Sequence, residues 1–440
     1  MWRFIGQNFH GIHLKQSKII IKKLKMFTYI EKISPQRIAF ISILIGSILR
    51  LLFPFDIEFK YDQKLMLDWV LEFQNKGSFR EIGMMSGGGV YNFGLGVWLF
   101  YLLGYISNTP VGLTMVVSVI NVISLGLMFW FIQTKIKDTS EKDTWFYALS
   151  LMSISIIPFV CSRNIWIQSI LPTFSIAIWI LYYSRSRKFL STFTLSFLLV
   201  LIGQIHLSGL FLCFVMSGFI AYFHFKNIRE VHLFGYIVGG LIAALPMIPL
   251  FVHMIQNPQL NPSSSWDNMK DVRILWFHLF DGLGLDVFYT LENSTWLFFK
   301  YPSILGFNTY LVGFCYLSIL LLSIYYLIKF LISLLQIRFS FNLKAIDISS
   351  FTAQFLWICF FTYAMIYFIK IRIFSHYWII TFPFIYLLCI KLFKSNKISI
   401  VALILLNLIM TICFVFFIHQ TGGLEDSYYG LTYERVYGRR

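Results

Sequence analysis

Long apolar segments recur along this 440-residue chain, and they constrain its fold more than any other feature. A soluble domain carries roughly 25% charged residues, whereas this chain carries 13%, so lipid must solvate much of its surface. We therefore predict an all-α polytopic membrane protein with about eleven transmembrane helices, which excludes a soluble enzyme, a secreted disulfide scaffold and a disordered protein. The predicted spans lie near residues 37–54, 112–133, 145–161, 169–184, 191–203, 207–224, 232–253, 304–326, 347–369, 377–391 and 398–419.

A twelfth apolar stretch, residues 92–107, decides the sidedness of everything that follows it. It is short and glycine-containing. If it does not cross, 22 Lys and Arg residues fall inside and 14 outside, whereas crossing gives 17 and 19. The positive-inside rule favours the first arrangement. We therefore predict an interfacial or re-entrant helix on the outer face of the cytoplasmic membrane, with the N-terminus in the cytosol and the C-terminus outside.

This topology divides the chain into three parts. Residues 1–36 form a basic cytosolic segment, residues 37–419 the transmembrane domain, and residues 420–440 an outer tail. The first part lacks the apolar region and cleavage site of a removable signal peptide. Met26 is an alternative start, which would leave residues 1–25 outside the protein. The net charge of +16 falls on the cytosolic face, so it gives no reason to invoke nucleic acid.

Two long outer loops are predicted, at residues 55–111 and 254–303. Loops of this length on one face usually carry function. Within the first, residues 56–75 can form an amphipathic helix ahead of the glycine turn at residues 87–89. That turn either lets the backbone approach a ligand closely or is simply flexible.

Several function classes lack their sequence signatures. The chain contains no Walker motif, GxGxxG, HExxH or GxSxG, so ATP hydrolysis, redox chemistry and zinc proteolysis have no support. The six cysteines form no CxxC pair, which indicates neither a zinc site nor a disulfide framework.

Charged residues near predicted span ends are the best candidates for chemistry, because placing them there costs free energy. Asp62 closely follows the first span and can act as a general base, or it is a solvated acid paired with Lys60 or Lys64. Arg163, in a short outer loop, can clamp a phosphate or extend to the membrane interface. His206, at an outer turn, is a ligand or a packing residue.

A second outer cationic cluster lies further along the chain. Lys370, Arg372 and His376 are basic positions on the less basic face, which favours anion binding. They can also belong to an interfacial belt with Tyr377 and Trp378.

Several stretches in order resemble bacterial membrane glycosyltransferases of the GT-C superfamily. The most similar group is family 39-like, related to protein mannosyltransferases and lipid A aminoarabinose transferases. The resemblance covers most of residues 37–391. It is carried by Tyr61-Asp62-Gln63, the glycine-rich stretch Gly83–Trp98, Arg163–Gln168, Gln204–Gly209, Ala244–Pro249 and His376-Tyr377.

The resemblance implies a transferase whose active site faces away from the cytosol. Such enzymes take a sugar from a polyprenyl-phosphate donor and pass it to a glycan, lipid or protein acceptor. An acidic residue of the first outer loop is the base, and Asp62 matches it. Members usually carry a second acid where this chain has Gln63, so a metal-bridged acidic pair is disfavoured and no cofactor is assigned. The substrate-binding residues implied are Gln63, Arg163, Gln168, His206, Arg372, His376 and Tyr377.

Other classes remain open at this point. A transporter or flippase of lipid-linked sugars would have charged residues along a path through the spans, whereas here the acids lie in outer loops. An oligosaccharide polymerase or ligase would share the large outer loop and the basic residues. A purely structural membrane protein leaves the ordered motifs unexplained.

Overall fold

A computed structural model gives the architecture of most of the chain. It describes residues 32–85, 91–227, 231–257, 280, 282–285, 287–336, 350–368, 379–393, 396–425, 427 and 429–438.

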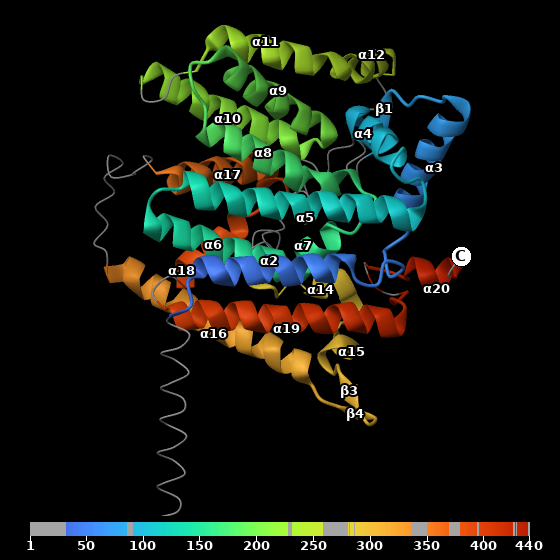
Figure 1. Ribbon diagram of the computed structural model, residues 1–440, viewed down its shortest axis with the longest axis vertical. Coiled ribbons are helices and arrows are strands. Elements are labelled where there is room, and N and C mark those ends of the chain that lie inside the picture. Colours follow the sequence, from blue (N-terminus) through green and yellow to red (C-terminus); the bar gives the residue numbers. More distant parts are fainter. Residues whose placement is uncertain are drawn as a thin grey trace, which may run out of the picture.

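Helices dominate these residues, and the long ones lie side by side along one direction (Figure 1). Two small antiparallel hairpins, β1 (Ile82–Met85) with β2 (Tyr91–Phe93) and β3 (Ser303–Ile304) with β4 (Phe307–Asn308), are additions that the all-α prediction did not include. The helices are α2 (Pro35–Leu51), α3 (Tyr61–Lys76), α4 (Leu95–Gly104), α5 (Pro110–Lys135), α6 (Thr139–Ile154), α7 (Ile156–Cys161), α8 (Leu171–Tyr183), α9 (Phe189–Ile205), α10 (Ser208–Phe225), α11 (Leu233–Ala244), α12 (Ile248–Gln256), α14 (Val287–Leu291), α15 (Thr295–Phe299), α16 (Leu311–Gln336), α17 (Phe351–Phe368), α18 (Phe384–Phe393), α19 (Lys397–Thr421) and α20 (Tyr433–Tyr437).

In the described part of the chain, six helical segments are long and apolar enough to cross a membrane, which supports a multi-pass membrane protein. They are α5, α10, α11 continued through α12, α16, α17 and α19. Shorter apolar helices include α4, α8, α9 and α18; the last three overlap other predicted spans, but they fall short of the length that marks a candidate span. The count of eleven spans therefore stays a prediction.

One predicted span begins too early. Residues 304–326 were expected to cross as a helix, but residues 303–308 form the β3–β4 hairpin and α16 begins only at Leu311. The apolar side chains of Ile304, Leu305 and Phe307 suit a membrane-spanning helix as well as a hairpin. Composition alone therefore does not locate the first residue of α16.

The predicted span at residues 145–161 is interrupted between α6 and α7. Pro158 has no N–H to donate to the carbonyl of Ile154, and the hydroxyl of Thr411 on α19 donates to that carbonyl instead. This interruption leads the chain through the short α7 to the loop that carries Arg163.

A buried arginine packs against this interruption. Arg50, at the end of α2, is 2% exposed and donates to the carbonyls of Gly46 and Ser153. Its side chain also lines a cavity of about 20 Å³ together with Asn121 and Ser162. Such a volume holds about one or two water molecules, so this cavity is too small for a sugar donor.

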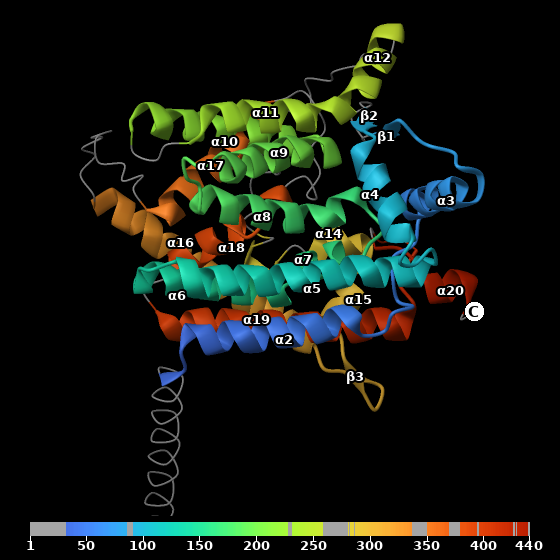
Figure 2. The ribbon, with the colours of Figure 1, turned by 45° about the horizontal axis from the view of Figure 1, so that its top comes forward.

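The first long loop contains the predicted helix, α3, and a second short helix, α4. Its helix α3 begins at Tyr61, five residues later than position 56, and packs against α4 through the stacked rings of Phe73 and Tyr101. The ten residues of α4 extend roughly 15 Å, half the hydrocarbon thickness, which suits a helix that does not cross. Figure 2 shows α3, α4 and α20 at the same end of the bundle, here called the α3 end.

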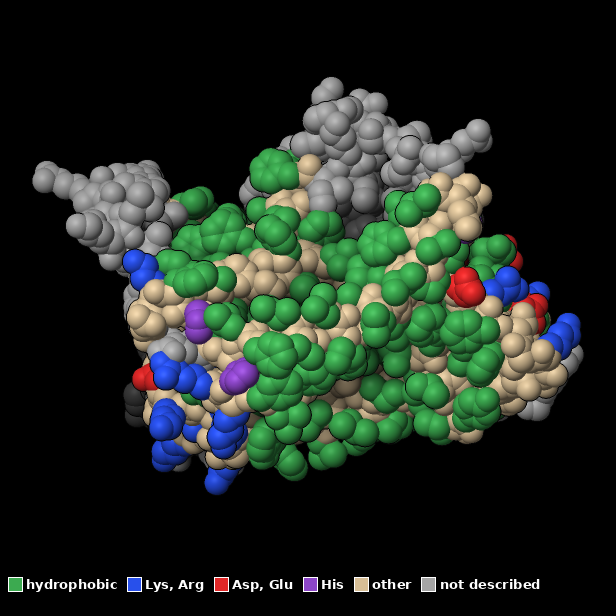
Figure 3. Space-filling view, turned by 90° about the horizontal axis from the view of Figure 1, so that it is seen from above, with side chains coloured by type: hydrophobic (Ala, Val, Ile, Leu, Met, Phe, Trp, Pro, Cys, Tyr) green, Lys and Arg blue, Asp and Glu red, His purple; other side chains and the backbone are tan. Residues whose placement is uncertain are grey.

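Basic residues gather at the opposite end (Figure 3). They include the exposed Lys135, Lys137, Arg187, Lys188 and Lys226, at or between the ends of α5, α6, α8, α9 and α10. These residues belong to the segments predicted to be cytosolic, so by the positive-inside rule this end is the predicted cytosolic side.

Candidate functional site

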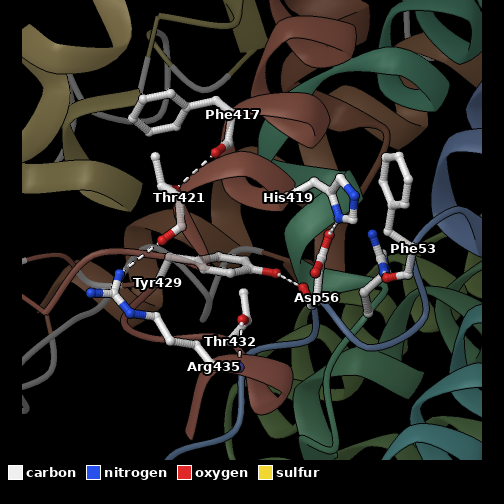
Figure 4. A network of polar contacts seen from close by, with 9 residues as sticks. Phe53, Asp56, Phe417, His419, Thr421, Tyr429, Thr432 and Arg435 are labelled. Carbon is white, nitrogen blue, oxygen red and sulfur yellow. Dashed lines mark hydrogen bonds and ion pairs between the residues drawn. The ribbon is translucent and has the colours of Figure 1, made fainter. Parts of the chain in front are cut away.

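The chain between α2 and α3 meets two distant segments at the α3 end. Residues 52–60 are non-helical apart from a turn, and they contact the loop after α7 and the C-terminal tail. We call the group that meets here the tail junction (Figure 4 shows part of it). It consists of Phe53, Asp56, Glu58, Arg163, Asn164, His419 and Tyr429.

Asp56 is the centre of the tail junction. Its carboxylate is 2.8 Å from Nδ1 of His419, and its backbone carbonyl accepts a hydrogen bond from the Tyr429 hydroxyl (Figure 4). The His419 ring stacks on Phe53 with centroids 3.7 Å apart. Burial raises the pKa of Asp56, and the hydrogen bond with His419 opposes this rise.

Arg163 joins the tail junction to the bundle. Its guanidinium donates to the carbonyl of Phe53 at 2.8 Å and lies over the ring of Phe159. The residue is 4% exposed. Burial lowers its pKa, while the nearby Tyr429 and Asp56 raise it. In this arrangement Arg163 holds protein groups together, and its guanidinium is not open to a phosphate from outside.

The tail closes over this segment through backbone pairing. Thr432 bridges Glu58, and the N–H of Tyr433 donates to the carbonyl of Ile57 at 3.0 Å. The rings of Tyr433 and Tyr437 pack edge-on against Phe59. The predicted outer tail is therefore a structural part of the site.

Glu58 is a buried acid with two polar partners. Its carboxylate accepts a hydrogen bond from the Asn164 side chain at 2.9 Å and pairs with Lys60 Nζ at 3.3 Å. The residue is 3% exposed, and this burial raises its pKa to about 7 despite the opposing effect of Lys60. Glu58 therefore exchanges a proton near neutral pH.

Glu58→Gln is expected to remove a pH dependence of stability. The unfolded carboxyl titrates near 4.5 and the folded one near 7, so the folded state binds the proton more tightly. Stability is thus greatest below pH 4.5 and falls as pH rises to 7, by about 3 kcal/mol. The variant keeps an acceptor for Asn164 and should be more stable than the natural protein at pH 8. Thermal unfolding in detergent from pH 4.5 to 8 measures this.

Glu72→Gln serves as the control for this titration. Glu72 is a half-exposed acid on α3 paired with Arg80, so its replacement removes the same type of acid while Glu58 and its partner Asn164 stay in place. A profile as steep in Glu58→Gln as in the natural protein would assign the pH dependence to another group.

Asp62, the predicted base, is exposed in the first turn of α3 at the α3 end. Gln63 beside it is 1% exposed, and its side-chain oxygen accepts from the N–H of Lys60 at 2.9 Å. Gln63 therefore caps the start of α3. Because its side chain is buried, this capping role is favoured over contact with a substrate.

Gln168 and His206 lie on other elements than Asp62, and their chain neighbours Ile167 and Ile205 both approach Gly96 of α4. Gln168 is half-buried in the 3-10 turn Ile167–Ile170. His206 ends α9 and its Nδ1 lies 2.8 Å from the Ser208 hydroxyl. Burial lowers the pKa of His206 to about 4, so its imidazole is neutral at pH 7 and brings no positive charge to a phosphate.

The other predicted site residues fall elsewhere. Arg372, His376 and Tyr377, and the glycine turn at residues 87–89, lie outside the described residues. Within the described part of the chain, no group of three His, Cys, Asp or Glu side chains is placed to hold a metal ion.

Sequence reasoning did not single out Asp56, Glu58, His419 or Tyr429. Asp56 and Glu58 are two of several acids in the predicted outer loops. Their alternation, Asp56-Ile57-Glu58, is a weak signal of extended chain, but nothing in the sequence indicates that the tail packs on it.

Comparison with known proteins gives no match: no protein-family model, no curated protein and no solved structure matches this chain.

Proposed function

We propose that the protein is a membrane glycosyltransferase. It moves a sugar from a polyprenyl-phosphate donor to a glycan, lipid or protein acceptor at the outer face of the cytoplasmic membrane. The observation that carries this proposal is the contrast among the three acids that follow α2. Asp56 and Glu58 are buried and paired, whereas Asp62 is exposed and available to a substrate. The sequence resemblance supports the donor class.

In this proposal Asp62 is the general base. Its carboxylate takes the proton of an acceptor hydroxyl as that oxygen attacks the sugar C1. The bond between C1 and the phosphate oxygen breaks, and the phosphate leaves as an ionised group that needs no general acid. Positive charge stabilises this leaving group, and Arg372 and His376 are assigned to it from the sequence.

Arg163 and His206 are not assigned as phosphate ligands. Arg163 is engaged with the Phe53 carbonyl, and the neutral His206 is 3% exposed. The lipid tail of the donor would lie against the apolar outer faces of the spans, where large side chains such as Phe314 on α16 are exposed.

The direct test is donor turnover by the purified protein in liposomes. With a radiolabelled polyprenyl-phosphate hexose and a mixture of glycan and lipid acceptors, we expect release of polyprenyl phosphate together with labelled acceptor. A panel of hexose and pentose donors that all remain intact would contradict the proposal. Movement of the donor across the bilayer without cleavage would identify a flippase or transporter. Products lengthened by whole repeat units would identify a polymerase.

A further inference from the structure

An apolar hairpin projects from the chain between α15 and α16. Its strands β3 and β4 pair antiparallel around a two-residue turn. We call Ile304, Leu305 and Phe307 the apolar tip, and they are 61%, 92% and 79% exposed. Neighbouring apolar side chains with this much exposure mark an interaction surface rather than part of the core.

The turn itself does not explain a leucine at the tip. Leu305 and Gly306 have φ of 52° and 83°, and a two-residue hairpin turn with both central residues at positive φ favours asparagine, aspartate or glycine. A leucine is disfavoured in this left-handed region because its Cβ lies too close to the following carbonyl oxygen. Since Leu305 buries almost nothing within the protein, an apolar contact outside the protein is the compensation that its position calls for.

Polar groups at the base of the hairpin are bonded internally. The Ser303 hydroxyl donates to the Asn308 side chain at 2.9 Å. The N–H and hydroxyl of Thr309 both donate to the carbonyl of Pro302, at 2.9 and 2.7 Å. The base therefore needs little water, which suits a boundary between water and lipid.

The position of the hairpin favours lipid as its partner. Figures 1 and 2 show it projecting sideways from the bundle, beside α15, rather than along the helix direction. It leads directly into α16, a candidate span whose Leu311, Phe314 and Leu317 are exposed. The apolar tip therefore extends an apolar surface that lipid must already cover.

Exposed residues around the hairpin are of the interfacial type. Trp296 and Tyr310 are 68% and 54% exposed, and Lys300 is exposed between them in sequence. Tryptophan, tyrosine and lysine collect where the headgroups meet the hydrocarbon. This combination fits a lipid surface better than a protein partner.

We propose that the apolar tip inserts into the membrane interface of the leaflet at the α3 end. The hairpin is a non-spanning anchor that fixes α15 and the start of α16 relative to the lipid surface. The hairpin is also linked to the tail junction through α15. Phe298 of α15 packs against Phe417 of α19, which lies two residues before His419. The proposal is independent of the transferase reaction.

The test uses the full chain in phosphatidylcholine vesicles with a fluorophore attached to Leu305→Cys. We expect blue-shifted emission, quenching by nitroxide-labelled lipid and protection from aqueous iodide. The matched control is Lys76→Cys at the exposed end of α3. Its fluorophore should show no blue shift, little quenching by nitroxide-labelled lipid and strong quenching by iodide. Labelling of the unmodified protein gives the background from its own six cysteines.

A second variant separates the tip from the label. The fluorophore is placed on Ile304→Cys, and Leu305→Asn is added. Asparagine suits the left-handed turn but lacks the apolar side chain of leucine, so quenching of the fluorophore by nitroxide-labelled lipid should fall. Iodide quenching of the Leu305→Cys label as strong as at Lys76→Cys would overturn the proposal. So would cysteine cross-linking between two copies of Leu305→Cys without lipid quenching, which would identify a second chain as the partner.

Discussion

Asp62→Asn is expected to abolish sugar transfer while leaving the fold intact. A positioned general base contributes about 10²–10⁴-fold to a rate, and an asparagine cannot accept the proton of the acceptor hydroxyl. Because Asp62 is exposed in the first turn of α3, an isosteric amide fits its place, although it removes a negative charge that helps to raise the pKa of the buried Glu58. The measurement is the rate of polyprenyl phosphate release in liposomes, with thermal unfolding of the same preparation to show that the protein is folded.

Asp68→Asn is the matched control for this experiment. Asp68 is also an exposed acid on α3, about two turns further along the helix. Its replacement changes the charge of the helix by the same amount without touching the proposed base, so turnover should persist. Equal losses in both variants would point to the charge of α3 rather than to a base, and undiminished turnover in Asp62→Asn would falsify its assignment.

The helical architecture could largely be predicted, because apolar composition is a local property. Most predicted spans correspond to observed helices, and a ten-residue α4 fits the prediction that residues 92–107 do not cross. The errors arise where composition is ambiguous. At residues 304–308 an apolar stretch forms a hairpin because Leu305-Gly306 turns the chain, and at α6 and α7 a proline interrupts a run of otherwise uniform hydropathy.

The environment of the acids could not be predicted, because it depends on contacts between distant segments. Asn164, which donates to Glu58, lies 106 residues away, and His419 lies 363 residues from Asp56. Without these partners the sequence offers three similar acids after the first span. Only the fold distinguishes the two buried ones from the exposed Asp62.

Polar residues were also difficult to interpret from the sequence. Gln63 departs from the acid that the resemblance leads one to expect, and the sequence suggests only that a carboxylate is missing. In the structure its amide caps α3 from a buried position. A short-range geometric role of this kind leaves little trace in a pattern of charge and hydropathy.

Arg163→Gln is expected to destabilise the protein by about 3 kcal/mol, because removing one buried charged partner leaves the others uncompensated. Glutamine is too short to reach the Phe53 carbonyl, which Arg163 binds at 2.8 Å, and it removes the positive charge near the buried Asp56. The tail junction should loosen first. Thermal unfolding in detergent gives the loss, and protease cleavage within residues 420–440 reports release of the tail.

Arg80→Gln is the control, since Arg80 is an exposed arginine whose ion pair with Glu72 lies at the surface. Exposed pairs contribute about 0–1 kcal/mol, so this variant should unfold nearly as the natural protein does. The comparison also decides between two roles of Arg163. If Arg163 serves to bind protein groups, Arg163→Gln lowers the stability of the protein. At temperatures where the tail stays bound, the variant then keeps its donor turnover per folded molecule. If stability is unchanged and donor turnover is lost, Arg163 is a phosphate ligand that the closed tail junction hides, and the junction must open during the reaction.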